Sequence, residues 1–241
     1  MRKAKLIAAS ERAPGAEPRG ARRKRETRAR LLDAALRLMS ERGMEGVAIN
    51  EITEAADVGF GSFYNHFASK EAIYETLLDE AFERFADALD ALVAGVDDPA
   101  EVIAISVRHT VARALATPVW GRFMIREGLS AQTLARGLGR RLLRDIRDGI
   151  DAGRFKTDDP VMTFIATAGV AMAAISAALP GNHGAAASLI EKLGFDAGGV
   201  PERTAATVLR ALGLSVSAAR AIANRPLPAF DARASGGAKS S

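Results

Sequence analysis

The sequence predicts an all-α fold, and three observations carry that prediction. Apolar residues recur every three or four positions along most of the chain, as they do on one face of a helix. No stretch alternates convincingly between apolar and polar residues, so a sheet is not expected. Hydrophobic residues make up 48% and charged residues 26% of the 241, which is typical of a globular protein. The chain contains no Cys, which excludes disulfides, Cys-ligated zinc and thiol catalysis.

Residues 1–25 are predicted to form a disordered basic arm. They lack hydrophobic periodicity and contain two Pro and two Gly. Residues 1–30 carry eleven Lys and Arg against three Glu, while the rest of the chain is mildly acidic. Such a charge run favours a polyanionic partner near the amino terminus, and a solvated tail is the alternative. A signal peptide is not expected, because the apolar run at residues 6–9 is too short.

Four helices are expected in the first hundred residues. The first runs from about Thr27 until Gly43 ends it, and the second and third are short, at about 49–56 and 60–67. Asp57-Val58-Gly59 forms a tight turn between them. Ser69 is a good N-cap for the fourth helix, which continues to about Gly95. Residues 26–72 are thus predicted to be a helix-turn-helix domain.

The remaining chain, residues 73–224, is predicted to be one larger helical domain. Pro99 and Pro118 stand where first-turn prolines belong. The expected helices are 99–116, 118–128, 131–152, 159–179, 185–193, 202–213 and 215–224. Residues 225–241 contain Pro226, Pro228 and a Gly pair and are predicted to be a flexible tail.

Residues 161–180 are uncharged and long enough to span a bilayer. Seven of the twenty are Ala, small polar residues dilute the rest, and no aromatic belt flanks the segment. A helix that is apolar on every side can instead lie in a core or between subunits. We therefore expect a core or interface helix and no membrane partner.

The segment from Val47 to Leu78 carries the functional prediction. Two short helices around a tight turn can place the second helix in the major groove of DNA. Tyr64, Asn65 and His66 offer hydrogen-bond donors over one turn, and Lys70 adds a cation. The expected apolar nucleus consists of Ile52, Ala55, Ala56, Val58, Phe63 and Phe67.

Residues 27–78 resemble the tetracycline-repressor-type (TetR/AcrR) family of bacterial transcriptional regulators. The resemblance rests on Gly43, the Ile52-x-x-Ala55-Ala56 helix, Val58, the run Phe63-Tyr64-Asn65-His66-Phe67, and Lys70-Glu71. It implies an amino-terminal three-helix DNA-binding domain followed by a helical bundle that binds ligand and dimerises. Ala48 and Gly59 depart from the Ser or Thr caps that are usual in the family.

The resemblance also assigns roles to individual residues. Expected phosphate contacts are Thr27, Arg28, Tyr64, His66 and Lys70. Expected base-facing residues are Asn50, Phe60, Gly61, Ser62 and Asn65. None of these five is Lys or Arg, so the commonest guanine contact is missing. We expect modest direct readout, with Arg22–Arg25 reaching an adjacent minor groove.

The ligand and dimer surfaces are predicted less specifically. Candidate pocket residues for a small, largely apolar effector are His109, Arg113, Trp120, Phe123, Met124, Arg126, Phe164 and Met172, with plain core packing as the alternative for each. Candidate dimer-interface residues are Ala166, Gly169, Ala173, Ala177, Leu209 and Leu212. A two-fold dimer would match a pseudo-palindromic operator in double-stranded DNA.

The predicted function is therefore a cytoplasmic homodimeric repressor that a small molecule releases from its operator. The alternative is a DNA-binding regulator without an effector, controlled by a protein partner or by its abundance. An enzyme is not expected, since no nucleotide-binding, hydrolase or zinc-protease motif is present and there are three His in all. No cofactor and no metal are expected.

Overall fold

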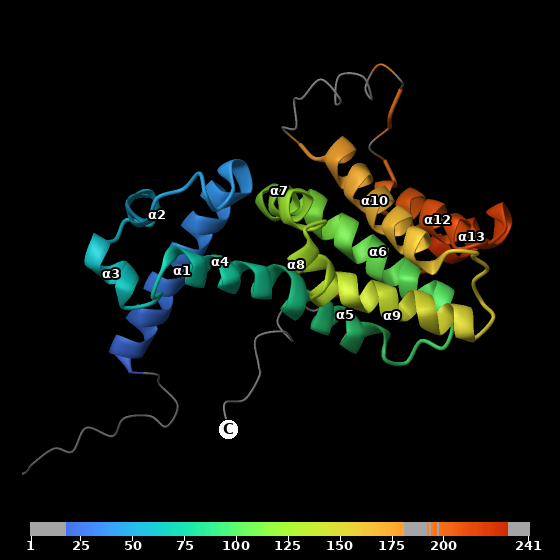
Figure 1. Ribbon diagram of the computed structural model, residues 1–241, viewed down its shortest axis with the longest axis horizontal. Helices are drawn as coiled ribbons and strands as arrows, with labels where there is room; N and C mark the ends of the chain where they lie inside the picture. The colour runs from blue at the N-terminus through green and yellow to red at the C-terminus, as the bar shows by residue number, and fades with distance from the viewer. Residues whose placement is uncertain (1–17, 181–191, 193, 197, 231–241) are drawn as a thin grey trace, which may run out of the picture.

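The computed structural model describes residues 18–180, 192, 194–196 and 198–230. The predicted all-α class is confirmed: across these ranges the regular elements are helices, and none is a strand. A small unit formed by the first helices of the chain stands at one end, and a larger bundle fills the other (Figure 1). One long helical rod joins the two.

The small unit contains α1 (Arg19–Arg42), α2 (Ile49–Ala55) and α3 (Phe60–Tyr64). The rod begins at α4 (Lys70–Leu78), passes through a π-helical turn, η1 (Asp79–Glu83), and ends as α5 (Arg84–Val93). Ser69 caps α4 as predicted, because its hydroxyl accepts a hydrogen bond from the Ala72 N–H at 3.2 Å. π-helical turns are rare and are often found at functional sites.

The larger bundle is built around α6 (Pro99–Ala116), which packs against α7, α9, α10, α12 and α13. The other helices are α7 (Pro118–Glu127), α8 (Ala131–Leu134), α9 (Gly137–Asp151), α10 (Pro160–Ala178), α12 (Val200–Ala211) and α13 (Val216–Ala223). Both predicted first-turn prolines, Pro99 and Pro118, begin their helices.

Two predicted boundaries at the amino-terminal end are wrong. The helix α1 begins at Arg19, so residues 19–25 are helical and not part of an arm, while residues 1–17 lie outside the described ones. The helix α3 ends at Tyr64 rather than at Phe67. The recognition element is therefore short, and α1 carries its basic residues on two additional turns.

The predicted helix 131–152 is two helices, α8 and α9. The chain turns at Gly137, whose φ of +46° is a conformation that favours glycine. A Cβ on Gly137 would lie 2.6 Å from the Phe82 carbonyl carbon, so the turn is pressed against η1. The predicted helix 185–193 falls almost entirely outside the described residues.

The segment 225–230 is not a free tail. The Arg108 guanidinium donates to the Arg225 carbonyl at 2.7 Å, and the Phe230 ring lies 5.4 Å from the Phe85 ring, centre to centre. The segment therefore lies against α5 and α6.

Within the described ranges, α10 is the one helix long and apolar enough to cross a membrane by length and composition. A core helix passes the same test, so this is weak evidence. The helix packs against α6, α7, α9 and α12. Its other face leaves Val161, Met162 and Ile165 about half exposed. This is the placement of a core helix with one open face.

Candidate DNA-binding face and effector cavity

The helix-turn-helix is held by a small apolar nucleus. Ile52 and Phe63 are fully buried and Phe67 nearly so. Asp57, in the turn, has a φ of +50°, and its carbonyl accepts a hydrogen bond from Arg30 at 3.2 Å. The predicted tight turn is thus confirmed, and Asp57 adopts the left-handed conformation that Asp tolerates better than most residues. Ala55 is exposed and does not belong to the nucleus.

Most of the residues predicted to face bases are open to solvent. Asn50, Phe60, Gly61 and Asn65 are exposed and Ser62 is half-buried. Phe60 is 54% exposed, and its ring lies edge-on to the Tyr64 ring, with centroids 5.6 Å apart. A Cβ on Gly61 would meet no atom within 4 Å, so backbone at the start of α3 can approach a partner closely.

The residues predicted to contact phosphate gather beside α3 and α4. The Arg28 guanidinium lies 5.0 Å from the centre of the Phe67 ring. Burial lowers the pKa of His66, and the positive charges of Lys24 and Arg28 lower it further. Lys24 falls within the Arg22–Arg25 segment that was expected to reach a minor groove, and it was not predicted as a phosphate contact. Thr27 is half-buried on the same helix, and Lys70 starts α4.

The two unusual caps have different consequences. Glu51 accepts a hydrogen bond from the Ala48 N–H at 2.8 Å, which is one half of a capping box. Ala48 has no side-chain oxygen to supply the other half. Glu51 is also paired with Arg42 at 2.8 Å. Gly59 leaves the start of α3 without a side-chain cap but with an open backbone.

A cavity of about 90 Å³ lies inside the larger bundle, between α5, α6, α7, α8, α9 and α10. A cavity needs about 10–15 Å³ to hold one water molecule, so this space is on the scale of a single-ring compound. Most of its wall is apolar, including Phe82, Leu89, Ile103, Met124, Leu138, Leu142 and Met172. The polar groups that line it are Asp90, Ser106, Thr110, Thr133, Arg141, Asp145 and Thr167.

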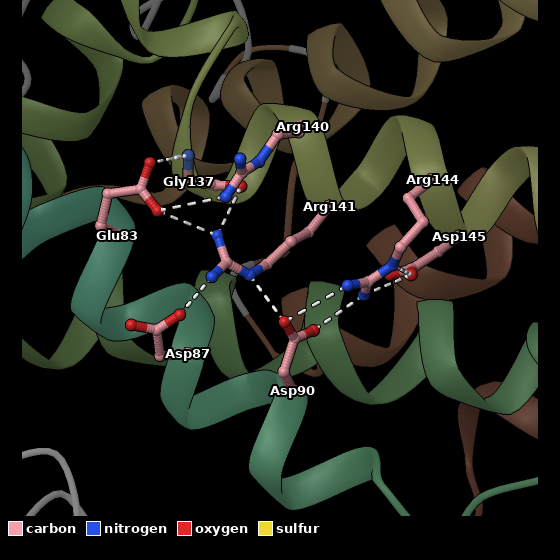
Figure 2. Close-up of polar contacts among 8 residues, drawn as sticks. All are labelled: Glu83, Asp87, Asp90, Gly137, Arg140, Arg141, Arg144 and Asp145. Atoms are coloured by element: carbon pink, nitrogen blue, oxygen red, sulfur yellow. Dashed lines mark hydrogen bonds and ion pairs between the residues drawn. The ribbon is translucent and has the colours of Figure 1, made fainter.

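One wall of the cavity is a network of carboxylates and guanidinium groups that α5 and η1 share with α9 (Figure 2). Arg141 binds Asp90 at 2.7 Å, Glu83 at 3.1 Å, and Asp87. Arg144 bridges Asp90 at 2.8 Å and Asp145 at 2.7 Å.

The electrostatics of this wall follow from burial and pairing. Burial alone would raise the pKa of Asp90, but hydrogen bonds from Arg144 and Arg141 outweigh it and lower that pKa. Burial dominates at Asp145 and raises its pKa, although Arg144 opposes the shift. The wall thus presents charges that are already compensated, which suits a neutral ligand with hydroxyl groups better than an ion.

Of the eight predicted pocket residues, Met124 and Met172 line this cavity and six do not. Arg113 lies over the Phe85 and Trp120 rings at 4.5 and 4.6 Å. Phe123 and Phe164 are buried in the core. His109 is also buried, its Nε2 is 3.1 Å from the Pro228 carbonyl oxygen, and burial lowers its pKa. For these residues the core alternative describes the structure.

The sixth, Arg126, joins the two units of the molecule. It donates to the carbonyls of Ser40 at 3.3 Å and Glu41 at 2.6 Å, at the carboxyl end of α1. A cation there satisfies carbonyls that have no partner within the helix. The next residue, Glu127, accepts a hydrogen bond from the Tyr74 hydroxyl of α4 at 2.6 Å. The helix α7 therefore reaches from the cavity to the DNA-binding unit.

The predicted dimer residues divide into two groups. Ala166 and Ala173 are exposed, and Gly169 and Ala177 are half-buried, on α10. Leu209 and Leu212 are fully buried within the protomer, where α12 packs on α6 and α10, so their prediction as interface residues is wrong.

Two family models match the chain. Residues 31–77 match the bacterial regulatory proteins of the tetR family, and residues 98–225 match the tetracyclin repressor-like carboxy-terminal domain. Among curated relatives, the A-factor receptor protein of Streptomyces griseus is 39% identical over 90 residues, which is 35% of this chain and 31% of that protein. The repressor DhaR of Mycobacterium sp. strain GP1 is 47% identical over 55 residues, 23% and 28% of the two chains. The chain thus spans about a third of the length of these relatives.

Solved structures match over much more of the chain. RolR, crystallised in complex with the ligand resorcinol, is 38% identical, with a TM-score of 0.60, 88% of this chain and all of that chain covered. A putative tetR family regulator from Shewanella sp. PV-4 has the same TM-score at 21% identity, covering 78% of this chain and 99% of that one, and so shows the fold alone.

Proposed function

The chain belongs to the tetR family of bacterial regulatory proteins, and from that premise we propose that it is a homodimeric repressor whose operator affinity a small neutral phenol lowers. It is a DNA-binding transcription regulator and not an enzyme. The observation that carries the proposal is the cavity, whose apolar space ends on a wall of compensated charges. RolR, 38% identical over most of the chain, has resorcinol as its ligand.

The proposed DNA contacts combine open surface with positive charge. Asn50, Phe60, Gly61, Ser62 and Asn65 face base edges, and Thr27, Arg28, Tyr64, His66 and Lys70 hold phosphates. We add Lys24 to the residues that contact phosphates, because its positive charge contributes to the lowered pKa of His66.

The helical form of residues 19–25 changes the role proposed for Arg22–Arg25. An α-helix with its side chains is about 10–12 Å wide and the minor groove about 6 Å, so this part of α1 cannot enter that groove. We place these cations against the phosphates beside it. Each such contact adds about 0.9 to the slope of log affinity against log salt.

A dimer is supported by the open face of α10. Val161, Met162 and Ile165 are 59%, 57% and 49% exposed, and the small residues Ala166, Gly169 and Ala173 lie among them. Small residues let a partner helix approach closely, and a second copy of this chain would cover the apolar side chains. The two-fold pair then presents two copies of α3 to a pseudo-palindromic operator.

A neutral phenol fits the cavity for three reasons. Its ring matches a space bounded by Phe82, Leu89 and Met124. Its hydroxyl can donate to the Asp90 or Asp145 carboxylate and accept from Arg141, which all line the cavity. An anion would add a charge next to carboxylates that the guanidinium groups already neutralise.

Isothermal titration calorimetry with resorcinol, cyclohexane-1,3-diol and benzoate tests this proposal. We expect resorcinol to bind, the saturated ring to bind more weakly because it is not planar, and benzoate not to bind. Equal binding of all three, or binding of benzoate alone, would contradict a site for neutral phenols. Light scattering of the same protein should give twice the mass of one chain.

A further inference from the structure

Thr167, near the middle of α10, has a buried hydroxyl with no hydrogen-bond partner. Its side chain is fully buried and lines the cavity, and no protein atom in the described ranges bonds its Oγ1. Buried hydroxyl groups in proteins are nearly always paired, so an unpaired one calls for an explanation.

Threonines on the other helices show what the ordinary arrangement is. The hydroxyls of Thr76, Thr110, Thr204 and Thr207 each donate to the carbonyl four residues earlier, at 2.7–2.9 Å. This bond is available to a helical Thr without any movement of the backbone. Thr167 does not make it, so its hydroxyl is held for another partner.

The other threonine hydroxyls of the cavity are already bonded. Thr110 also lines the cavity, but its hydroxyl is used at the Ser106 carbonyl. The Thr133 hydroxyl is bonded to that of Ser130 at 2.8 Å. Of these three cavity threonines, Thr167 alone has its hydroxyl uncommitted, and the cavity is the space that this residue lines.

We propose that Thr167 is a specificity-determining residue, which binds a second hydroxyl group on the effector. One hydroxyl of the ligand is held at the wall formed by Asp90, Arg141 and Asp145, on α5 and α9. The other is held by Thr167 on α10, so the site takes an aromatic diol in preference to a phenol with one hydroxyl. The inference rests on the proposed function, because it names a contact within the same effector site.

A ligand lacking the second hydroxyl leaves Thr167 unpaired in the complex. A site built to bond a hydroxyl discriminates strongly against an analogue without it, since the protein group then loses its only partner. One hydroxyl can be removed from the ligand and one from the residue. The energy of their interaction can therefore be measured by a double-mutant cycle in which the ligand takes the place of the second mutant.

The test is calorimetric binding of resorcinol and of phenol to the full chain and to Thr167→Val. Valine has the shape of threonine without the hydroxyl, so it removes the proposed contact and no hydrogen bond of the free protein. We expect wild-type protein to prefer resorcinol, and Thr167→Val to lose about tenfold in affinity for resorcinol while phenol affinity stays within about twofold. Thr167→Ser should keep the preference.

Thr110→Val is the matched control. It removes a cavity hydroxyl that is already bonded to the Ser106 carbonyl, so any loss should be equal for the two ligands. Thr167→Val should unfold at the same temperature as wild type or higher. Equal losses for resorcinol and phenol in Thr167→Val, or no loss for resorcinol, would overturn the role of Thr167 while leaving the phenol site intact. Failure of wild-type protein to bind either compound would overturn the proposed function itself.

Discussion

The DNA-binding face and the effector cavity satisfy their polar groups in opposite ways. On the face, Phe60 and Tyr64 are half exposed, and Arg19, Arg23 and Lys24 have no carboxylate partner among the described residues. In the cavity, Arg141 alone bonds three carboxylates. The face is completed by an outside partner that carries negative charge, whereas in the cavity the charged groups are paired with one another and the Thr167 hydroxyl is buried without a partner.

This difference separates affinity from specificity. Cations left open on a surface attract any polyanion and give binding that depends strongly on salt. A largely apolar cavity whose charges are already paired disfavours ions, and we expect it to bind a neutral compound that supplies the missing hydrogen bond. The hydrogen bonds made by Arg126 and Glu127 connect the two regions, so a conformational change in one region can be transmitted to the other.

The largest effect on the ion pairs of the cavity wall is expected from a substitution at Arg141. Arg141→Ala leaves Glu83, Asp87 and Asp90 without their shared cation, and we expect a loss of about 3 kcal/mol in the free energy of unfolding in urea. Arg140→Ala is the control, because Arg140 is 66% exposed and lies 3.9 Å from Glu83. Its loss should stay below about 1 kcal/mol. Equal losses would mean that the network does not hold α9 on α5.

The connection between the regions can be cut at Arg126. Arg126→Ala removes the bonds to the Ser40 and Glu41 carbonyls but does not touch the cavity. Resorcinol should bind with unchanged affinity, while its effect on operator affinity falls about fivefold. Fluorescence anisotropy of labelled operator DNA measures this. Arg220→Ala, an exposed change on α13, should leave both quantities as in wild type.

The DNA-binding unit can be stabilised at its missing cap. Ala48→Ser supplies the hydroxyl that completes the box begun by Glu51, and we expect a gain of about 1 kcal/mol in stability. Thermal unfolding measures the gain. Gly59→Ser should add only a few tenths of a kcal/mol. A larger gain in stability from Gly59→Ser than from Ala48→Ser would contradict the claim that the missing cap of α2 is the more costly one.

The smallest expected effect is a pH dependence at the face. Burial, Lys24 and Arg28 hold the pKa of His66 below its ordinary value in the free protein. A DNA phosphate beside it favours the protonated ring, so the pKa is higher in the complex than in the free protein. Operator affinity gained this way is fully present below the free-state pKa and is lost as pH rises through the bound-state pKa.

Operator affinity should therefore rise about threefold between pH 7.5 and pH 5.5, measured by anisotropy at constant salt. His66→Gln keeps a hydrogen-bond donor without the titration and should give a flat profile. A profile that is the same in both proteins would remove His66 from the phosphate contacts.

The DNA-binding unit could be predicted from sequence because its determinants are local. The spacing of Ile52, Phe63 and Phe67 fixes a nucleus within sixteen residues, and each of the three is buried as expected. Ala55 was wrongly predicted to be buried, because helical spacing alone does not determine the rotation of a short helix about its own axis. The start of α1 was missed because its first two turns have no apolar periodicity and make no core contact.

The cavity could not be predicted in the same way, because its wall is assembled from six helices. The aromatic residues Trp120 and Phe123 were expected to line it, but both are buried in the core, where Trp120 lies beside Arg113 and Phe123 beside Tyr74 and Phe82. One signal was present: acidic residues at 83, 87 and 90 and basic residues at 140, 141 and 144 recur at helical spacing on two helices. Their pairing depends on α5 lying against α9, which only the fold determines.

The central claim is that occupancy of the cavity weakens the DNA-binding face. Operator DNA selected by the protein should be titrated by anisotropy at about 150 mM salt, without resorcinol and with resorcinol at saturation. The account predicts a loss of operator affinity of about 5- to 150-fold, the range typical of coupled sites, and no loss with benzoate. Saturating resorcinol with unchanged operator affinity would contradict it.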